Sequence, residues 1–208
     1  MGGMDPLQDQ MRFLLECDRL KSVLRQSTIT NLSRRENSAE HFWHLGLLAL
    51  VLAEHAPPGT DLARVTAMVL IHDLVEIDAG DLFLYSDAAA QERQEAAERA
   101  AADRIFPLLP APQGEQLRAL WDEFEERRTP EARFARALDR LQPMLLNTVT
   151  NGGTWAAHGI TADQVLLRVK LIEDGSPSLG AYARQLVLDS VERGLLLPPA
   201  AGATAPES

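Results

Sequence analysis

Apolar residues recur along most of the chain at the three- and four-residue spacing of an amphipathic helix, and strand-like alternation is nearly absent. The pattern predicts an all-α protein without internal repeats. Asp5 followed by Pro6 begins the first predicted helix, which continues to about Leu24. The next stretch, "RQSTITNLSRRE", is predicted to be a loop, because Ser, Thr and Asn side chains compete for backbone hydrogen bonds.

The second predicted helix is the most apolar in the chain. Asn37 and Glu40 have the spacing of a capping box, and the segment "HFWHLGLLALVLAEH" after them is apolar on nearly all sides. We therefore expect a central, buried helix. The third begins at Thr60 or Asp61 and continues to about Ile77.

Five further helices are predicted from the same periodicity, from the Ala-rich composition of the first and from the start Thr129-Pro130-Glu131 of the third. They cover approximately residues 87–106, 114–127, 129–142, 161–172 and 178–192. Pro143 lies four positions after Asp139 and cannot donate to its carbonyl, so we expect the helix to kink or end there.

Length and composition indicate one globular domain. The chain has 208 residues, of which 46% are hydrophobic and 24% charged. We expect a single domain over residues 5–197 and a disordered tail over 198–208. The net charge of −10 opposes binding to nucleic acid or to an anionic membrane. A lone Cys17, with no secretion signal and no membrane-spanning run, indicates a cytoplasmic protein.

Candidate chemistry is concentrated in "IHDLVEIDAGD", where a histidine and several carboxylates interrupt an apolar run. If the helix continues through this segment, His72 and Glu76 lie one turn apart, with Asp73 beside them. Exposed acids at a helix end are the simpler interpretation. Adjacent His and Asp residues in an apolar run favour a metal site instead, because buried carboxylates need a cation or another partner.

Such a site needs further ligands from elsewhere in the chain. His41 is the first candidate, although it is also typical of a hydrogen-bonded core histidine, and His44 is equally placed by sequence. Asp139 is a second candidate; its alternative is an ion pair with Arg136 or Arg140. Histidine and carboxylate ligands suit Mn, Fe, Co or Zn, and Mg is compatible.

Together, His41, the doublet His72-Asp73 and Asp139 resemble the H…HD…D signature of HD-domain metal-dependent phosphohydrolases. The segments "RRENSAEH", "HDLVEIDAGD" and "TPEARFARALDRLQP" are similar to the 5′-deoxynucleotidase-like branch of that family. The resemblance extends from about residue 11 to about residue 195. It implies an HD-domain helical bundle of about seven to nine helices, in which these four residues bind one divalent cation.

The resemblance also implies roles for two further acids. Glu76 and Asp81 look like the additional acidic pair of this branch, which activates the attacking water, protonates the leaving alcohol or holds a second cation. We expect Glu76 to be the main catalytic acid or base and Asp81 the second.

An anionic substrate also needs cationic groups, and Arg25 and Arg34 are the candidates near His41 in sequence. Arg34 has an alternative as the partner of Glu36 or Glu40. Similar deoxynucleotidases carry an Arg-Trp pair in the first loop, whereas this chain has "RQS", so the aromatic residue is missing.

The resulting hypothesis is a cytoplasmic phosphohydrolase that removes phosphate from nucleoside 5′-monophosphates, with deoxy forms preferred. One alternative keeps the site but changes the substrate to a signalling nucleotide, a diester or a non-nucleotide phosphate. Another is a non-catalytic regulator in which the metal is a structural clip. The resemblance further suggests a homodimer.

Overall fold

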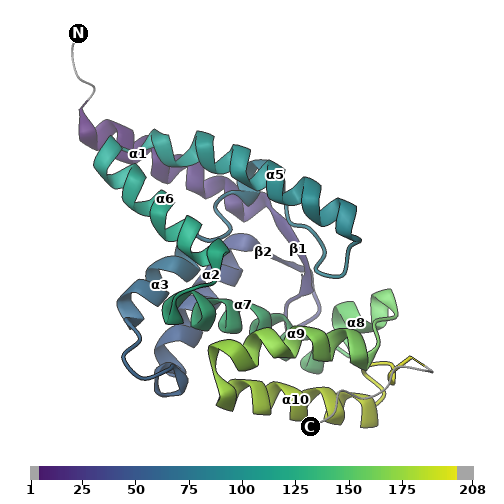
Figure 1. Cartoon of the computed structure of the whole chain (residues 1–208). Helices are drawn as coiled ribbons and strands as arrows, with labels where there is room; N and C mark the ends of the chain where they lie inside the picture. Colours follow the sequence, from purple (N-terminus) through teal and green to yellow (C-terminus); the bar gives the residue numbers. More distant parts are fainter. Residues whose placement is uncertain (1–4, 201–208) are drawn as a thin grey trace.

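The structure, a computed structural model, describes residues 5–200 and is dominated by α-helices (Figure 1). The longer elements are α1 Pro6–Cys17, β1 Leu24–Thr28, β2 Arg35–Asn37, α2 Ser38–Val51, α3 Leu62–Ile71, α5 Ala88–Ile105, α6 Ala111–Glu126, α7 Pro130–Val149, α9 Ala162–Gly175 and α10 Pro177–Glu192. The shorter ones are α4 Glu76–Ala79, α8 Gly153–His158 and the 3₁₀ segments Asp18–Ser22, Ala53–His55 and Phe106–Leu108. The expected all-α class is confirmed.

Helix α7 lies at the centre of the arrangement. It contacts α2, α3 and α6 on one side and α9 and α10 on the other. In Figure 1, α1, α5 and α6 lie together at one end of the molecule, and α8, α9 and α10 lie at the opposite end. Residues from distant parts of the chain therefore meet around α7.

Local capping follows the sequence closely. Asn37 and Glu40 form both hydrogen bonds of a capping box at the start of α2. Asp61 accepts hydrogen bonds from two amides of α3, which decides between the two predicted starts. Thr129 caps α7, with Pro130 at its first position.

The predicted loop at residues 25–36 is instead an antiparallel hairpin of β1 and β2. The first helix is correspondingly shorter than predicted, because α1 ends at Cys17 and a 3₁₀ turn follows. The side chain of Arg35 donates hydrogen bonds to the carbonyls of Leu24 and Arg25, which joins the two strands. Strand pairing between separate segments overrode the local preference of the Ser and Thr residues.

The predicted helix 60–77 is also broken. Helix α3 ends at Ile71, and a tight turn leads to the single-turn helix α4. The carbonyl of His72 accepts a hydrogen bond from the indole of Trp121 at 3.0 Å, while the amide of Glu76 donates to the Asp73 carbonyl. A tertiary contact therefore redirects the chain at the His-Asp doublet.

Two further helices differ from the predictions. Of the two outcomes expected at Pro143, an end of the helix is wrong, because α7 continues to Val149 with α2, α3, α9 and α10 packed around it; a kink there stays a prediction. Helix α2 is not buried on all sides. Its residues Leu45 and Ala49 face the core, whereas Trp43 is 67% exposed and Leu50 66% exposed.

The core consists of two groups of buried apolar residues. One joins α2, α3, α7, α9 and α10, and the other joins α1, α2, α5, α6 and the turn after α3. The ring of His72 lies between them, with its centroid 5.2 Å from that of Phe42 and 4.8 Å from that of Phe124. Polar groups at this junction are shielded from solvent.

Only the first three residues of the predicted tail, 198–200, are among those that the structure describes. Residues 201–208 of the predicted disordered tail lie beyond them, whereas Ala200 is described and donates its amide hydrogen bond to Asp163. The single domain expected over 5–197 stays a prediction. Among the described helices, none combines the length and apolar character needed to cross a membrane.

Candidate metal centre

Four predicted ligands meet at the junction of the two cores. His41 lies in the first turn of α2, His72 and Asp73 follow the end of α3, and Asp139 lies in the middle of α7. One ligand atom from each of these residues lies within 4.8 Å of the others. Within residues 5–200 this is the one group of three or more such side chains placed to hold a metal ion. We call it the His–Asp cluster.

The backbone and an amide side chain orient both imidazoles. The Nδ1 of His72 lies 3.1 Å from the carbonyl oxygen of Val69, and the Nδ1 of His41 lies 3.2 Å from Oε1 of Gln142. Because both partners accept hydrogen bonds, each Nδ1 carries a proton and each Nε2 is the nitrogen that remains for a metal ion. Both Nε2 atoms face the cluster, which is the tautomer that metal ligation requires.

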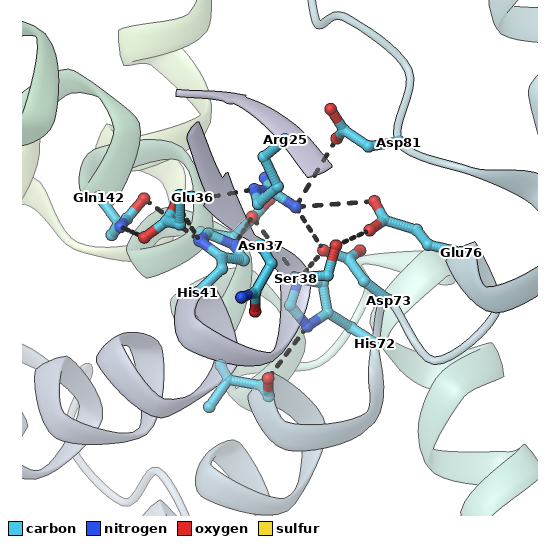
Figure 2. A network of polar contacts seen from close by, with 12 residues as sticks. Arg25, Glu36, Asn37, Ser38, His41, His72, Asp73, Glu76, Asp81 and Gln142 are labelled. Atoms are coloured by element: carbon cyan, nitrogen blue, oxygen red, sulfur yellow. Dashed lines mark hydrogen bonds and ion pairs between the residues drawn. The ribbon is translucent and has the colours of Figure 1, made fainter. Parts of the chain in front are cut away.

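Gln142 was not identified from the sequence, although it lies three residues after Asp139 on a helix face that is otherwise apolar. It is fully buried, and its amide nitrogen donates to Oε1 of Glu36 at 2.9 Å. This hydrogen bond fixes the amide so that its oxygen accepts from His41. Figure 2 shows Gln142 and Glu36 beside His41, on the side away from His72. The sequence did hold a sign of this role: Gln142 is a polar residue on the predicted buried face of the helix, one turn after the candidate ligand Asp139.

The protonation of the two histidines differs because their neighbours differ. Burial and the positive charge of Arg25 lower the pKa of His41 to about 4, so its ring is neutral. Burial also disfavours charged His72, but the carboxylates of Asp73 and Asp139 outweigh it and raise the pKa to about 10. The pocket therefore attracts positive charge at His72, which a cation can supply in place of the proton.

The residues present fit a divalent cation. The Nε2 atom of His72 is buried and lacks a hydrogen-bond partner among the described residues. It lies 3.1 Å from Oδ2 of Asp73 and 3.6 Å from Oδ1 of Asp139. Two imidazole nitrogens and two carboxylates form a mixed donor set that suits first-row divalent metals.

Arg25 connects the His–Asp cluster to the acidic pair. Its Nη1 lies 2.9 Å from Asp73, 3.6 Å from Glu76 and 3.7 Å from Asp81. Its Nε lies 3.9 Å from Glu36 (Figure 2). Four carboxylates thus surround one buried guanidinium, and the hairpin that was predicted to be a loop places it there.

Glu76 is buried and Asp81 is half-buried, both beside Arg25. Burial, then the negative charge of Asp73, raises the pKa of Glu76 well above its usual value, and Ser38 donates a 2.6 Å hydrogen bond to it. Burial raises the pKa of Asp81 as well, although Arg25 opposes the change. The structure therefore brings this predicted pair together next to the cluster.

A cavity of about 280 Å³ opens onto the cluster. Its walls include Arg136 and Arg140 on α7, which flank Asp139 and were considered only as its ion-pair partners in the sequence. Both contacts exist, at 3.7 and 3.6 Å from Oδ2 of Asp139. The aromatic residues Phe83, Tyr85 and Trp155 form another part of the wall.

Arg34 lies elsewhere. Its guanidinium pairs with Glu40 through hydrogen bonds, its side chain is 51% exposed, and it is not part of the cavity wall. Arg34 therefore pairs with Glu40, as the alternative to substrate binding had it. His44 lies behind the cluster, where its Nδ1 is 3.2 Å from the Gln142 amide nitrogen.

An all-helical fold with histidines and aspartates from α2, α3 and α7 around one point defines the class of HD-domain proteins. The chain belongs to the HD domain family, whose pattern matches residues 17–179. A predicted metal-dependent phosphohydrolase of Magnetospirillum magnetotacticum MS-1 is 52% identical, with a TM-score of 0.89 over 93% of this chain and 96% of its own. A conserved hypothetical protein of Pyrococcus furiosus shares the fold, with 22% identity and a TM-score of 0.62 over 88% and 99% of the two chains.

Curated relatives are more distant in sequence. The human 5′-deoxynucleotidase HDDC2 is 28% identical over 65% of this chain and 65% of its own length. The 5′-deoxynucleotidase hdd1 of Schizosaccharomyces pombe is 25% identical over 62% and 66%. The chain thus matches slightly less than two thirds of the length of these relatives.

Proposed function

We propose that this protein is a metal-dependent phosphohydrolase that removes phosphate from nucleoside 5′-monophosphates, with deoxy forms preferred. The observation that carries the proposal is the His–Asp cluster, in which the Nε2 atoms of His41 and His72 face the carboxylates of Asp73 and Asp139. The names of the 52% identical bacterial protein and of the 5′-deoxynucleotidases support the reaction and the substrate class.

In the proposed reaction, His41, His72, Asp73 and Asp139 hold the divalent cation. The cation would lower the pKa of water and neutralise negative charge on the phosphoryl oxygens. Gln142 and the Val69 carbonyl keep the two imidazoles in the required tautomer. Manganese or cobalt is our first expectation for the ion, with iron, zinc and magnesium as alternatives.

Glu76 moves the proton in this proposal. It is buried beside Asp73, and the hydrogen bond from Ser38 holds its carboxyl group in one orientation. Its pKa, raised above the usual value of a glutamate by burial and by Asp73, suits a group that exchanges a proton with water or with the leaving alcohol. Asp81 is the second acid of the pair, and Arg25 holds both acids close to the cluster.

The test is release of inorganic phosphate from a panel of nucleotides, after chelation and addition of manganese or cobalt. Glu76→Gln should lose about 10²- to 10⁴-fold in turnover while keeping its bound metal. Glu92→Gln, on the exposed side of α5, is the matched control and should keep full activity. If no nucleotide is hydrolysed, the substrate proposal fails, and hydrolysis confined to diesters would replace it with the phosphodiesterase alternative.

The same variant separates an enzyme from a metal-clipped regulator. A regulator would keep its function in Glu76→Gln, because the clip needs only the four ligands. A second cation near Glu76 and Asp81 is the untested alternative role of this acidic pair. Since Arg25 already lies within 3.7 Å of both acids, we expect one metal ion per chain in elemental analysis. The homodimer and the cytoplasmic location also stay predictions.

A further inference from the structure

The two arginines expected to bind substrate are already engaged by carboxylates. Arg25 has four carboxylates within 4 Å, and Arg34 is paired with Glu40 away from the cavity. Neither arrangement leaves a free guanidinium facing the cavity. The cationic groups that a phosphate needs must therefore be sought elsewhere.

A second set of arginines lines the cavity and is only partly matched by carboxylates. We call it the arginine group, and it consists of Arg127, Arg136, Arg140 and Arg168. The positive charges of the other three act on Arg140, which shows that the four side chains lie close enough to repel one another. Gathering like charges at a partly buried surface is unfavourable unless something compensates them.

The compensation within the described residues is incomplete. Glu125 lies 3.8 Å from Arg127 and 3.9 Å from Arg136, and Asp139 lies 3.6–3.7 Å from Arg136 and Arg140. Arg168 has no carboxylate within 4 Å in that part of the chain; it donates to the Leu84 carbonyl at 3.2 Å. Within 4 Å the four cations thus share two carboxylates, and one of these, Asp139, also faces both histidines; Glu95 and Glu98 line the same cavity at longer range.

The contacts of these arginines with Glu125 and Asp139, at 3.6–3.9 Å, are too long to be hydrogen bonds. The Nε atoms of Arg136 and Arg140 are buried and have no hydrogen-bond partner among residues 5–200. The side chains of these two residues are only 12% and 19% exposed. The guanidinium of Arg136 is held over the Phe124 ring at 5.0 Å, so its position is fixed by packing rather than by an acid.

The backbone of Arg127 gives independent support. This residue ends α6 with φ of 57°, in the left-handed region that favours glycine or asparagine. A side chain kept at such a position, and lining the cavity, is typical of a functional constraint.

We propose that Arg136 and Arg140, with Arg127 and Arg168 in the same cavity wall, form a binding subsite for a phosphoryl dianion next to Oδ2 of Asp139. Asp139 joins this subsite to the His–Asp cluster, since its Oδ1 faces His41 and His72 and its Oδ2 faces the arginines. The identification of the anion as the substrate's phosphoryl group rests on the proposed function; the anion site itself does not.

Titration calorimetry with inorganic phosphate tests the subsite without turnover. Arg136→Gln and Arg140→Gln should each weaken phosphate binding by about tenfold or more, since each removes charged hydrogen bonds to the anion. Their metal content, measured in the same samples, should stay at the wild-type level. Arg133→Gln, one turn earlier on α7 and 40% exposed, removes the same charge outside the cavity and should bind phosphate as the wild type does.

Unchanged phosphate affinity in both variants would overturn the proposal. So would a parallel loss of metal and phosphate, because the arginines would then act only by positioning Asp139. If the variants do not fold, arginine modification by phenylglyoxal in the wild-type protein replaces them: phosphate should protect Arg136 and Arg140 and leave Arg133 reactive. Lack of protection contradicts the subsite. The two proposals can fail separately. If the protein hydrolyses no nucleotide but the arginine variants still lose phosphate binding, the proposed function is refuted and the anion subsite stands.

Discussion

At the scale of single residues, the most informative side chain is Gln142. It contributes no ligand atom, yet its oxygen sets the tautomer of His41 and its nitrogen binds the carboxylate of Glu36. Both hydrogen bonds are buried, so neither group has water as a substitute partner. The amide therefore links the hairpin, α2 and α7 at the His–Asp cluster.

We predict that Gln142→Leu lowers the affinity for divalent metal about 10- to 100-fold, because His41 loses the acceptor that orients its ring. Competition with a chromogenic chelator measures the affinity directly. Gln185→Leu, on the exposed face of α10, is the control and should bind metal normally. A wild-type metal affinity in Gln142→Leu would show that His41 is oriented by other contacts.

At the scale of elements, the close packing of α7 on α9 positions the central helix. Gly175 at the end of α9 lies against the backbone of α7: a Cβ atom there would be 2.2 Å from the carbonyl oxygen of Arg133 and 2.9 Å from Cβ of Ala137. Real Cβ atoms do not approach a backbone oxygen so closely. Glycine is therefore required here by the distance between the helices, not by its backbone angles.

We expect Gly175→Ala to destabilise the fold by about 1–3 kcal/mol, since the helices must move apart to admit the methyl group. Gly46 in α2 is the matched control, because the nearest atom to its added Cβ is Cδ2 of Leu70 at 3.8 Å. Gly46→Ala should be neutral or stabilising by up to about 1 kcal/mol. Chemical denaturation followed by circular dichroism compares the two, and equal stabilities would contradict the packing argument.

At the scale of the whole molecule, the His–Asp cluster joins segments that are far apart in sequence. Its ligands come from α2, the turn after α3 and the middle of α7, and the two apolar cores meet beside it. A cation bound there would cross-link the folded chain and would find no equivalent site in the unfolded one. Metal binding should therefore stabilise the entire fold.

Chelation should accordingly lower the melting temperature. At a free metal concentration of a hundred times the Kd, binding adds about 2.7 kcal/mol, or about 5–10 °C for a protein of this size. His41→Ala should remove the metal-dependent shift, whereas His55→Ala, outside the His–Asp cluster, should retain it. Equal melting temperatures with and without metal in the wild type would argue against a site in the folded protein.

The amino-acid sequence by itself determined the helical class, most helix starts and the four candidate ligands. These features depend on local spacing and on capping side chains, as at Asn37, Asp61 and Thr129, and on the resemblance carried by the H…HD…D residues. Only the tertiary structure decided the hairpin, the break after Ile71, the continuation of α7 through Pro143 and the places of Arg25 and Arg34. Each of these results from contacts between segments that are distant in sequence, such as the Trp121 hydrogen bond to the His72 carbonyl, which outweigh local preference and leave no periodic signal along the chain.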